Sequence, residues 1–468
     1  MSSDQSVRHF DQSITEGPIL RSVWKIAWPT MLQNVITGLQ GFVDHAMVGN
    51  FVGYHGNAAI GVSWQIFLVV LVFVSSIFTG MGVMVARFAG ANDPATVNRV
   101  VQQAFLTAAG LACLILAPIG YFLAPALLNF VNADAVVQAE ALPYLRIMVV
   151  SSIGLLLFFM IGVALRSAGD AKTPLRLGVL LTILNIGLNI VFIRGLGPIP
   201  AFGTMGAAMG TVLAAAIVSV IGMYYLFSGR LVIRLQKRIG WKPDIQIIRS
   251  LFGFGLPTGV QGIAMNVAGV LLLRFIGSLP DSAEAQAAYT VGYTQLFSLV
   301  TWTSVGLMGA TAAVAGQNLG AGKPERTKEA VRTASRLGLG VAAAIGLAFL
   351  LVPGRLLGIF GIADSTVLNL GFELLRFLSL SGLFVTVALA YTGGLQGTGD
   401  TRSPLVISII SQMIIPVGFC LLMQSTTTLQ SYHVWLAILF GHFARASLSM
   451  LRFRQGKWAD IKVDLNRT

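Results

Sequence analysis

Charged residues are scarce in this chain of 468 residues, where only 10% are Asp, Glu, Lys or Arg. A soluble protein of ordinary composition has about 25%, so these side chains are too few to cover a surface exposed to water. Hydrophobic residues make up 55% of the chain, and the mean hydropathy is +0.79. The composition excludes a soluble globular protein and predicts an integral membrane protein, whose helices each need about 20 apolar residues.

Side chains for metal, disulfide and nucleotide chemistry are few as well. The two cysteines, Cys113 and Cys420, lie in separate apolar segments, which predicts neither a disulfide framework nor a metal site. The five histidines are scattered, and no Gly-Lys-Ser/Thr loop is present to hold a phosphate. We therefore expect no enzyme activity, no cofactor, no metal and no direct use of ATP.

The net charge of +13 does not indicate a nucleic-acid partner, because the basic residues fall in short gaps between apolar runs. Run lengths and helix-breaking residues predict an all-α integral membrane protein of about twelve transmembrane helices. The predicted spans are 20–50, 58–88, 98–130, 138–166, 174–195, 203–228, 248–277, 286–316, 329–360, 368–396, 403–424 and 430–452. Most of the 31 Lys and Arg residues would face the cytoplasm if both termini are inside.

The second half of the chain repeats the first. Residues 90–94 are echoed by 320–324, and residues 166–175 by 396–405, both at an offset of 230. Parallel repeats suit a transporter whose substrate site lies between the halves, although gene duplication also produces repeats in channels. The predicted division is a cytoplasmic tail at 1–18, a six-helix bundle at 19–228, a cytoplasmic linker at 229–246, a second six-helix bundle at 247–455 and a cytoplasmic tail at 456–468.

Of the 18 acidic residues, 17 fall in inner segments or at the outer ends of spans, as Glu329, Glu140 and Glu373 do, and Asp44 is the one left inside a predicted span. A charge at membrane depth costs about 2.5–3.5 kcal/mol, so its presence there favours a function. A carboxyl group can take up a proton on one side of a membrane and release it on the other when its surroundings change. Two alternatives are a structural hydrogen bond between helices and a site for Na⁺, which also prefers oxygen ligands.

Four polar residues are candidates for coupling a proton or cation at Asp44. Asn185 and Asn189 are four positions apart and share one helical face, where their amides could reach Asp44 or simply hold helices together. Gln40 lies one turn before Asp44. Thr211 could join the site or bond to its own backbone.

His45 follows Asp44 directly, and adjacent helical positions point about 100° apart, so the two cannot share a face. It could relay a proton or lie at a helix interface. Aromatic and Met side chains could line a cleft for flat cations, although in spans they more often face lipid or the core. These substrate-cleft candidates are Met31, Met47, Trp64, Phe67, Tyr293, Trp302 and Tyr391.

Four segments, taken in order, resemble the multidrug and toxic compound extrusion (MATE) family over essentially the whole chain. Residues 28–29 and 43–49 resemble the family's first helix, the Gly-Asp-x-Lys-Thr-Pro turn at 169–174 its fourth loop, and residues 206–211 its sixth helix. The resemblance implies two pseudo-symmetric six-helix bundles with a central cleft. It also implies a bacterial inner (plasma) membrane and export of cationic or amphipathic compounds against H⁺ or Na⁺.

The pattern is most similar to the DinF-like, proton-coupled branch, and this implies that Asp44 carries the proton among Asn185, Asn189 and Thr211. Two positions depart from the family: Asn189 stands where some members carry a second acid, and His45 where Thr is usual. The stretches 259–270 and 381–396 contain no acid, although the largely sodium-linked branch carries acids there. This argues against a second-half cation site of that kind.

The sequence therefore predicts a secondary active multidrug antiporter that exports cationic or amphipathic compounds in exchange for H⁺ by alternating access. Its expected partners are lipophilic cations and membrane lipids, and we expect a monomer. One alternative is a Na⁺-coupled exporter. The other is a flippase of lipid-linked sugars from the same superfamily, which would favour cationic residues in its cleft to bind pyrophosphate.

Overall fold

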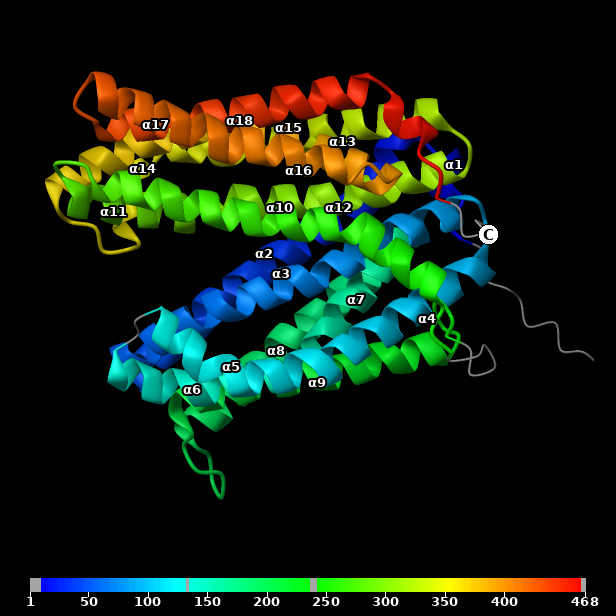
Figure 1. The fold of residues 1–468 in the computed structure, drawn as a ribbon, viewed down its shortest axis with the longest axis horizontal. Helices are drawn as coiled ribbons and strands as arrows, with labels where there is room; N and C mark the ends of the chain where they lie inside the picture. Colours follow the sequence, from blue (N-terminus) through cyan, green and yellow to red (C-terminus); the bar gives the residue numbers. More distant parts are fainter. Residues whose placement is uncertain (1–9, 132–133, 236–241, 464–468) are drawn as a thin grey trace, which may run out of the picture. The chain divides into compact units, whose positions relative to one another are not determined.

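The computed structural model describes residues 10–131, 134–235 and 242–463. Within these ranges there is no β-strand, only an isolated bridge between Leu196 and Ile199. The helices (Figure 1) are α1 Ser13–Glu16, α2 Ile19–Phe51, α3 Tyr54–Gly90, α4 Pro94–Gly110, η1 Leu111–Leu116, α5 Ala117–Phe130, α6 Ala135–Val150, α7 Ile153–Ser167, α8 Lys172–Arg194, α9 Gly203–Phe227, α10 Ile245–Gly277, α11 Ser282–Tyr289, η2 Thr290–Leu296, α12 Ser298–Gly320, α13 Pro324–Leu351, α14 Pro353–Gly358, α15 Ser365–Thr398, α16 Arg402–Ile409, η3 Ile410–Ile414, α17 Ile415–Thr426, α18 Ser431–Arg454 and η4 Lys457–Asp460.

The predicted all-α membrane fold is confirmed. Ten helical segments in the described ranges are long and apolar enough to cross a membrane, and α6 with α7, bent by 50°, make an eleventh if they form one span. The 33 residues of α2 would cover about 50 Å at 1.5 Å per residue, and its polar side chains, including Asp44, lower its hydropathy. The predicted total of twelve spans, which would include α2, stays a prediction.

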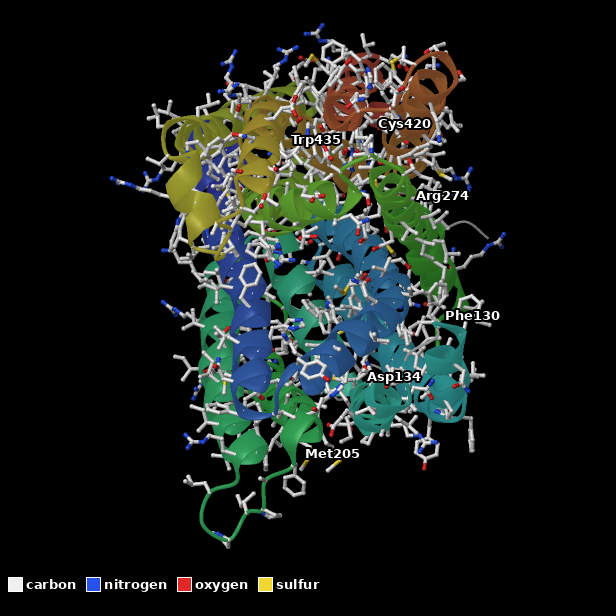
Figure 2. The ribbon with its side chains drawn as sticks, turned by 90° about the vertical axis from the view of Figure 1, so that its left-hand side faces the viewer. Phe130, Asp134, Met205, Arg274, Cys420 and Trp435 are labelled. Carbon is white, nitrogen blue, oxygen red and sulfur yellow. The ribbon has the colours of Figure 1, made fainter. Side chains whose placement is uncertain are left out.

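Large apolar side chains project outward from these helices, as Figure 2 shows for Phe130. Phe130 is 84% exposed, and Phe122 and Leu114 are each 77% exposed. Exposed apolar surface on this scale marks a surface made for lipid or a partner. Together with the scarcity of charge, it indicates that the bilayer covers these helices.

By their contacts the residues form two compact units. Unit 1 is mainly Ile36–Gly259, and unit 2 is Ser13–Val35 with Val260–Val463, so that α2 and α10 each contribute to both. The two six-helix bundles and their linker stay a prediction. Residues 1–9, 236–241 and 464–468 of the predicted tails and linker lie outside the described residues.

Glycines allow the first part of α2 to pack closely within unit 2 and the first part of α10 to pack closely within unit 1. In unit 2 a Cβ atom on Gly306 of α12 would lie 2.6 Å from Cα of Met31, and in unit 1 a Cβ on Gly80 of α3 would lie 2.1 Å from the carbonyl oxygen of Leu251. Any larger residue would separate these backbones. Small residues allow such close packing between membrane helices.

The internal repeat is visible in two matching turns. Gly169 and Gly399 both have φ of 101°, a conformation that glycine adopts readily. The following residues, Asp170 and Asp400, each accept a bond from the hydroxyl three positions further on, at 2.6 and 2.8 Å. Both turns therefore begin the next helix in the same way.

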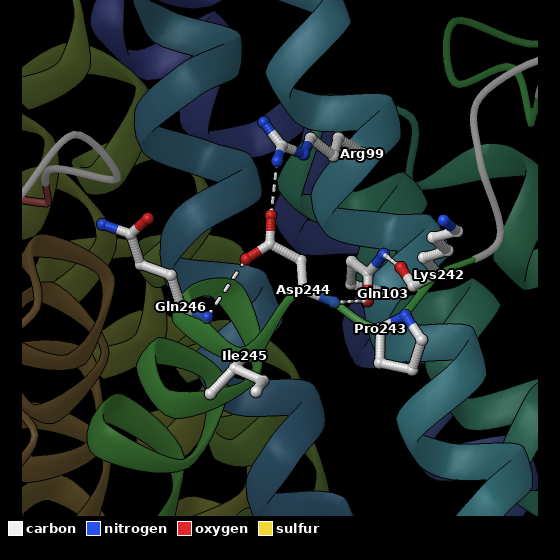
Figure 3. A pocket seen from close by; sticks show the side chains of 7 residues that line it. All are labelled: Arg99, Gln103, Lys242, Pro243, Asp244, Ile245 and Gln246. Carbon is white, nitrogen blue, oxygen red and sulfur yellow. Dashed lines mark hydrogen bonds and ion pairs between the residues drawn. The ribbon is translucent and has the colours of Figure 1, made fainter. Parts of the chain in front are cut away.

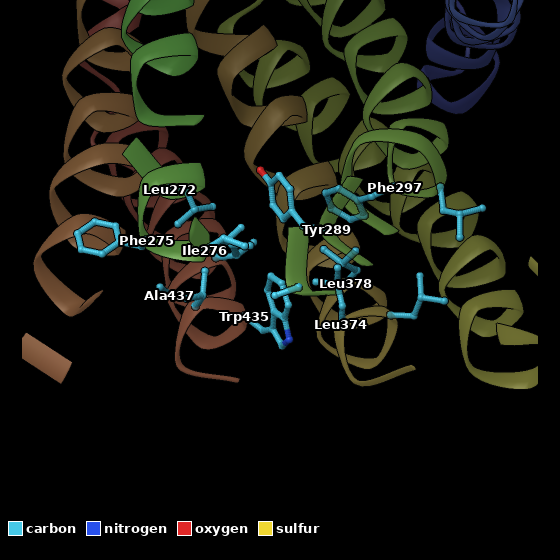
Figure 4. Packing of buried hydrophobic residues seen from close by; sticks show 14 of the residues in the cluster. Leu272, Phe275, Ile276, Tyr289, Phe297, Leu374, Leu378, Trp435 and Ala437 are labelled. Carbon is cyan, nitrogen blue, oxygen red and sulfur yellow. The ribbon is translucent and has the colours of Figure 1, made fainter. Parts of the chain in front are cut away.

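Unit 2 has its own apolar core (Figure 4). Buried residues of α10, α11, α12, α15 and α18 meet there, among them Ile276, Tyr289, Leu378 and Trp435. Tyr289 and Trp435 stack with ring centroids 6.3 Å apart. This aromatic stack borders the buried polar residues of α18 that are considered below.

Candidate functional site

Asp44 lies within unit 1 on α2, and α8 supplies its closest polar partner. The side-chain amide of Asn189 donates to Asp44 Oδ1 over 2.8 Å. Asn189 Nδ2 is also 3.4 Å from Asn185 Oδ1, and Asn185 Nδ2 donates to Thr211 Oγ1 over 3.0 Å. The structure thus joins four of the sequence-predicted residues into one chain of side-chain bonds from α2 through α8 to α9.

The helix period explains this arrangement on α8. Asn185 and Asn189 are both fully buried, as expected for positions four apart on one face. Both ends of the Asn185 amide and the nitrogen of the Asn189 amide are hydrogen-bonded, which lowers the cost of burying them, whereas Asn189 Oδ1 has no partner among the described residues. Thr211 accepts from Asn185, so its hydroxyl oxygen takes part in the polar chain.

Gly210 of α9 makes room for Asn189. A Cβ atom at Gly210 would lie 2.1 Å from Asn189 Oδ1 and 3.0 Å from the Asn189 backbone nitrogen. One turn earlier, a Cβ at Gly206 would lie 2.4 Å from the carbonyl oxygen of Phe192. The two glycines form the small-residue repeat that lets membrane helices approach, and they press α9 against α8 at the level of the site.

Tyr144 is a site residue that the sequence does not identify. It lies on α6, is only 5% exposed, and is close enough to Asp44 for an electrostatic interaction. A tyrosine inside an apolar span has no distinguishing pattern in the sequence. Its place beside Asp44 follows from the packing of α6 within unit 1.

Gln40 and His45 have partners other than Asp44. Gln40 Oε1 accepts a bond from the Thr182 hydroxyl of α8 over 3.1 Å. The His45 ring bonds through Nδ1 to Asn57 Oδ1 of α3. His45 therefore points toward α3, in agreement with the expectation that it does not share Asp44's helical face.

The predicted cleft residues are divided between the two units. Unit 1 contains Met47, Trp64 and Phe67, and unit 2 contains Met31, Tyr293, Trp302 and Tyr391. Phe67 and Tyr391 are buried, whereas Trp64 is 38% exposed. Tyr391 packs edge-on against Phe453 at 5.5 Å, and Tyr293 belongs to an aromatic stack in unit 2.

A cavity of about 770 Å³ lies elsewhere in unit 1, where α4 meets the end of the predicted linker (Figure 3). Arg99 pairs with Asp244 over 2.5 Å, and Gln103 donates to the carbonyl of Lys242 over 2.9 Å. Asp244 also accepts from the backbone of Gln246, where α10 begins. These bonds fasten the start of α10 to α4. None of the lining residues belongs to the polar chain at Asp44.

Among residues 10–131, 134–235 and 242–463, no group of three or more His, Cys, Asp or Glu side chains could hold a metal ion. The polar chain at Asp44 contains one carboxylate, two amides and a hydroxyl. The amide can orient the Asp44 carboxylate, and the carboxylate can take up and release a proton.

The chain matches one family model in two segments. Residues 29–191 and 257–422 match the model named MatE. The two segments begin 228 residues apart, in agreement with the internal repeat. Together they cover well over half of the chain.

Curated relatives are similar over nearly their full length. A probable multidrug resistance protein NorM of Thermotoga maritima is 27% identical, covering 94% of this chain and 93% of its own. A probable multidrug resistance protein YoeA of Bacillus subtilis is 24% identical, covering 94% of each.

Solved structures share the fold. A MATE family transporter of the MOP superfamily, in an outward-facing conformation, gives a TM-score of 0.88 at 21% identity, with 98% of this chain and 100% of that chain covered. A MOP superfamily transporter from Pyrococcus furiosus gives 0.88 at 21% identity, with 99% and 100% covered.

Proposed function

Since the chain belongs to the MatE family of membrane transporters, and is thus a transporter and not an enzyme, we propose that it is a multidrug exporter coupled to protons. It exchanges cationic or amphipathic compounds for H⁺ by alternating access, and Asp44 carries the proton. Two relatives named as probable multidrug resistance proteins align with this chain over 93% and 94% of their own length. Their names support the proposed class of cargo.

The observation that carries this proposal is the bond from Asn189 to Asp44. A carboxylate within a membrane span needs a partner, and the amide supplies one without cancelling the charge. A proton that binds Asp44 removes the charge, so the carboxyl no longer needs the amide donor. Protonation can thus change how firmly α2 is held to α8 within unit 1.

The direction of that bond favours H⁺ over Na⁺. The amide of Asn189 directs its nitrogen to Asp44, and the Asn189 oxygen faces Gly210. A hard cation needs several oxygen ligands directed at one point. In this arrangement an N–H group stands where a second oxygen ligand would have to be.

The same features support the DinF-like, proton-coupled branch. Asp44 is the acid of the polar chain in unit 1, and the stretches 259–270 and 381–396 contain no acid. A cation site of the other branch would need acids there. The proposal further includes a bacterial inner membrane with both termini cytoplasmic, a monomeric protein, and contact with membrane lipids.

Coupling is tested with purified protein in liposomes loaded with a fluorescent lipophilic cation. We expect a pH gradient alone to drive export, and a sodium gradient at uniform pH to drive none. Export driven by sodium alone would contradict proton coupling and would assign the chain to the other branch. The absence of export of any cationic dye under either gradient would contradict the proposed cargo.

A further inference from the structure

Two basic side chains are buried on one face of α18 in unit 2. His442 is 3% exposed and Arg445, three positions later, is 5% exposed. His442 Nδ1 and Arg445 Nε have no hydrogen-bond partner among the described residues. Groups three apart on a helix lie on the same side, so the two form one buried basic pair.

Aromatic rings border this pair. Tyr289 and Tyr293 stack 5.0 Å apart, Tyr293 and Phe297 5.4 Å apart, and Phe297 lies 5.9 Å from the His442 ring. Arg445 interacts electrostatically with Tyr293 and with His442. Tyr293 lies in η2, a π-helical turn, and such turns occur frequently at functional sites.

The ion pairs of unit 2 do not supply a counter-charge for Arg445. They join Lys323 to Glu16, Lys328 to Glu325 and Arg452 to Asp400. Within residues 10–131, 134–235 and 242–463, no carboxylate pairs with Arg445. A buried cation without a partner is costly, and this indicates that a negative group from outside the chain completes the site.

Buried hydroxyl groups add donors around the pair. Ser449 lies one turn after Arg445 on α18, and its Oγ has no partner in the described part of the chain. The same holds for Ser411 of η3, whose carbonyl oxygen would lie 2.7 Å from a Cβ on Gly441, next to His442. Donors without acceptors are what an anion requires.

We propose that unit 2 binds a monovalent anionic group, a carboxylate or a halide, at Arg445 and His442 against the rings of Tyr293 and Phe297. One guanidinium and one imidazole match a single negative charge. The pyrophosphate of a lipid-linked sugar carries more charge and would call for more cations. For a carboxylate that belongs to cargo, the inference rests on the proposed function and extends it to amphipathic compounds with an aromatic acid group.

The test measures the apparent melting temperature of the purified full chain in detergent. The probes are sodium benzoate, its neutral isostere benzamide, and sodium chloride, each titrated separately. Arg445→Gln removes the charge, Arg445→Lys keeps it, and Arg454→Gln is the matched control on an exposed position of the same helix. His442→Asn is a second route if Arg445→Gln does not fold.

We expect benzoate, and not benzamide, to raise the melting temperature of the parent in a saturable way. Arg445→Gln should weaken the apparent affinity roughly 10- to 100-fold, the loss expected for a hydrogen bond to a charged group. His442→Asn should also weaken it, Arg445→Lys should keep part of the affinity, and Arg454→Gln should match the parent.

A response to benzoate without one to chloride would identify a cargo carboxylate, whereas a saturable response to chloride alone would identify a free halide. A parent that responds to neither anion would overturn the inference, as would equal responses of Arg445→Gln and Arg454→Gln. The outcome is independent of the coupling mechanism, because Asp44→Asn should still bind benzoate. If dye export depends on Asp44 but no anion binds, the proposed function stands and this inference fails.

Discussion

Asn189 and Asp44 face each other across α8 and α2, with the amide nitrogen 2.8 Å from the carboxylate oxygen. One turn earlier on α2, Gln40 accepts from Thr182 of α8 over 3.1 Å. These two bonds join the same pair of helices. Only the one at Asp44 involves a group that can gain or lose a proton, so protonation can weaken one of the two bonds and leave the other.

Asn189→Ala removes the donor to Asp44. A hydrogen bond to a charged group contributes about 1.5–3 kcal/mol, so we expect proton-driven export to slow by about tenfold or more. The initial rate of dye export from liposomes measures this. Asn50→Ala is the control, because the exposed Asn50 bonds to the backbone of Ala46 and has no part in the polar chain at Asp44. Equal rates for the two variants would show that the Asn189 bond has no part in coupling.

Gly210→Ala places a methyl group 2.1 Å from Asn189 Oδ1. Asn189 must then move, so we expect a loss of export at least as large as that of Asn189→Ala. Gly187→Ala on α8, with open space around the added atom, should export like the parent. Size-exclusion chromatography confirms folding. Normal export by folded Gly210→Ala would mean that the position of Asn189 is not critical.

His45→Gln tests the relay hypothesis for the histidine beside Asp44. The His45 ring bonds to Asn57 of α3, so we expect the variant to keep proton-driven export. Its rate should depend on pH as that of the parent does. A profile that loses its dependence between about pH 5 and 8, where an ordinary histidine titrates, would assign the relay to His45.

Arg452 holds the second Gly-Asp turn. Its Nε and Nη2 donate to Asp400 Oδ2 over 3.0 and 2.8 Å, and the Asp400 side chain is 6% exposed. We expect Arg452→Gln to lower the free energy of unfolding by about 2–3 kcal/mol, because a buried carboxylate loses its charged partner.

Titration with SDS measures the unfolding of the Arg452 variant. Lys328→Gln breaks a pair in which the Glu325 side chain is 82% exposed, and it should cost about 0.5 kcal/mol or less. If both variants unfold at the same SDS concentration as the parent, Arg452 does not stabilise the turn.

The sequence predicts those site residues whose type or spacing distinguishes them from the apolar residues around them. Asp44 is conspicuous because an acid in an apolar span is rare. Asn185 and Asn189 are found by their spacing, since positions four apart share a helical face. The all-α membrane fold can be predicted from composition, and the repeat from matching segments. Both are patterns that can be read in the sequence without knowing which distant residues are in contact.

Contacts between distant segments could not be predicted in this way. Tyr144 lies beside Asp44, and Gly210 makes room for Asn189, because of how α6 and α9 pack, and neither residue differs from its neighbours in type. Arg445 and His442 belong to the same class. In the sequence Arg445 is one basic residue near the C-terminal end, and only the structure shows that it is buried beside Tyr293.

If Asp44 carries the proton, binding of cargo should release that proton from the purified protein. A lipophilic cation is added to purified protein in weakly buffered detergent solution, and the released protons are measured with a pH dye. We expect release by the parent and by Asp134→Asn, a control at the start of α6, and none by Asp44→Asn. Equal release from Asp44→Asn and the parent would contradict the claim, because the proton would then come from another group.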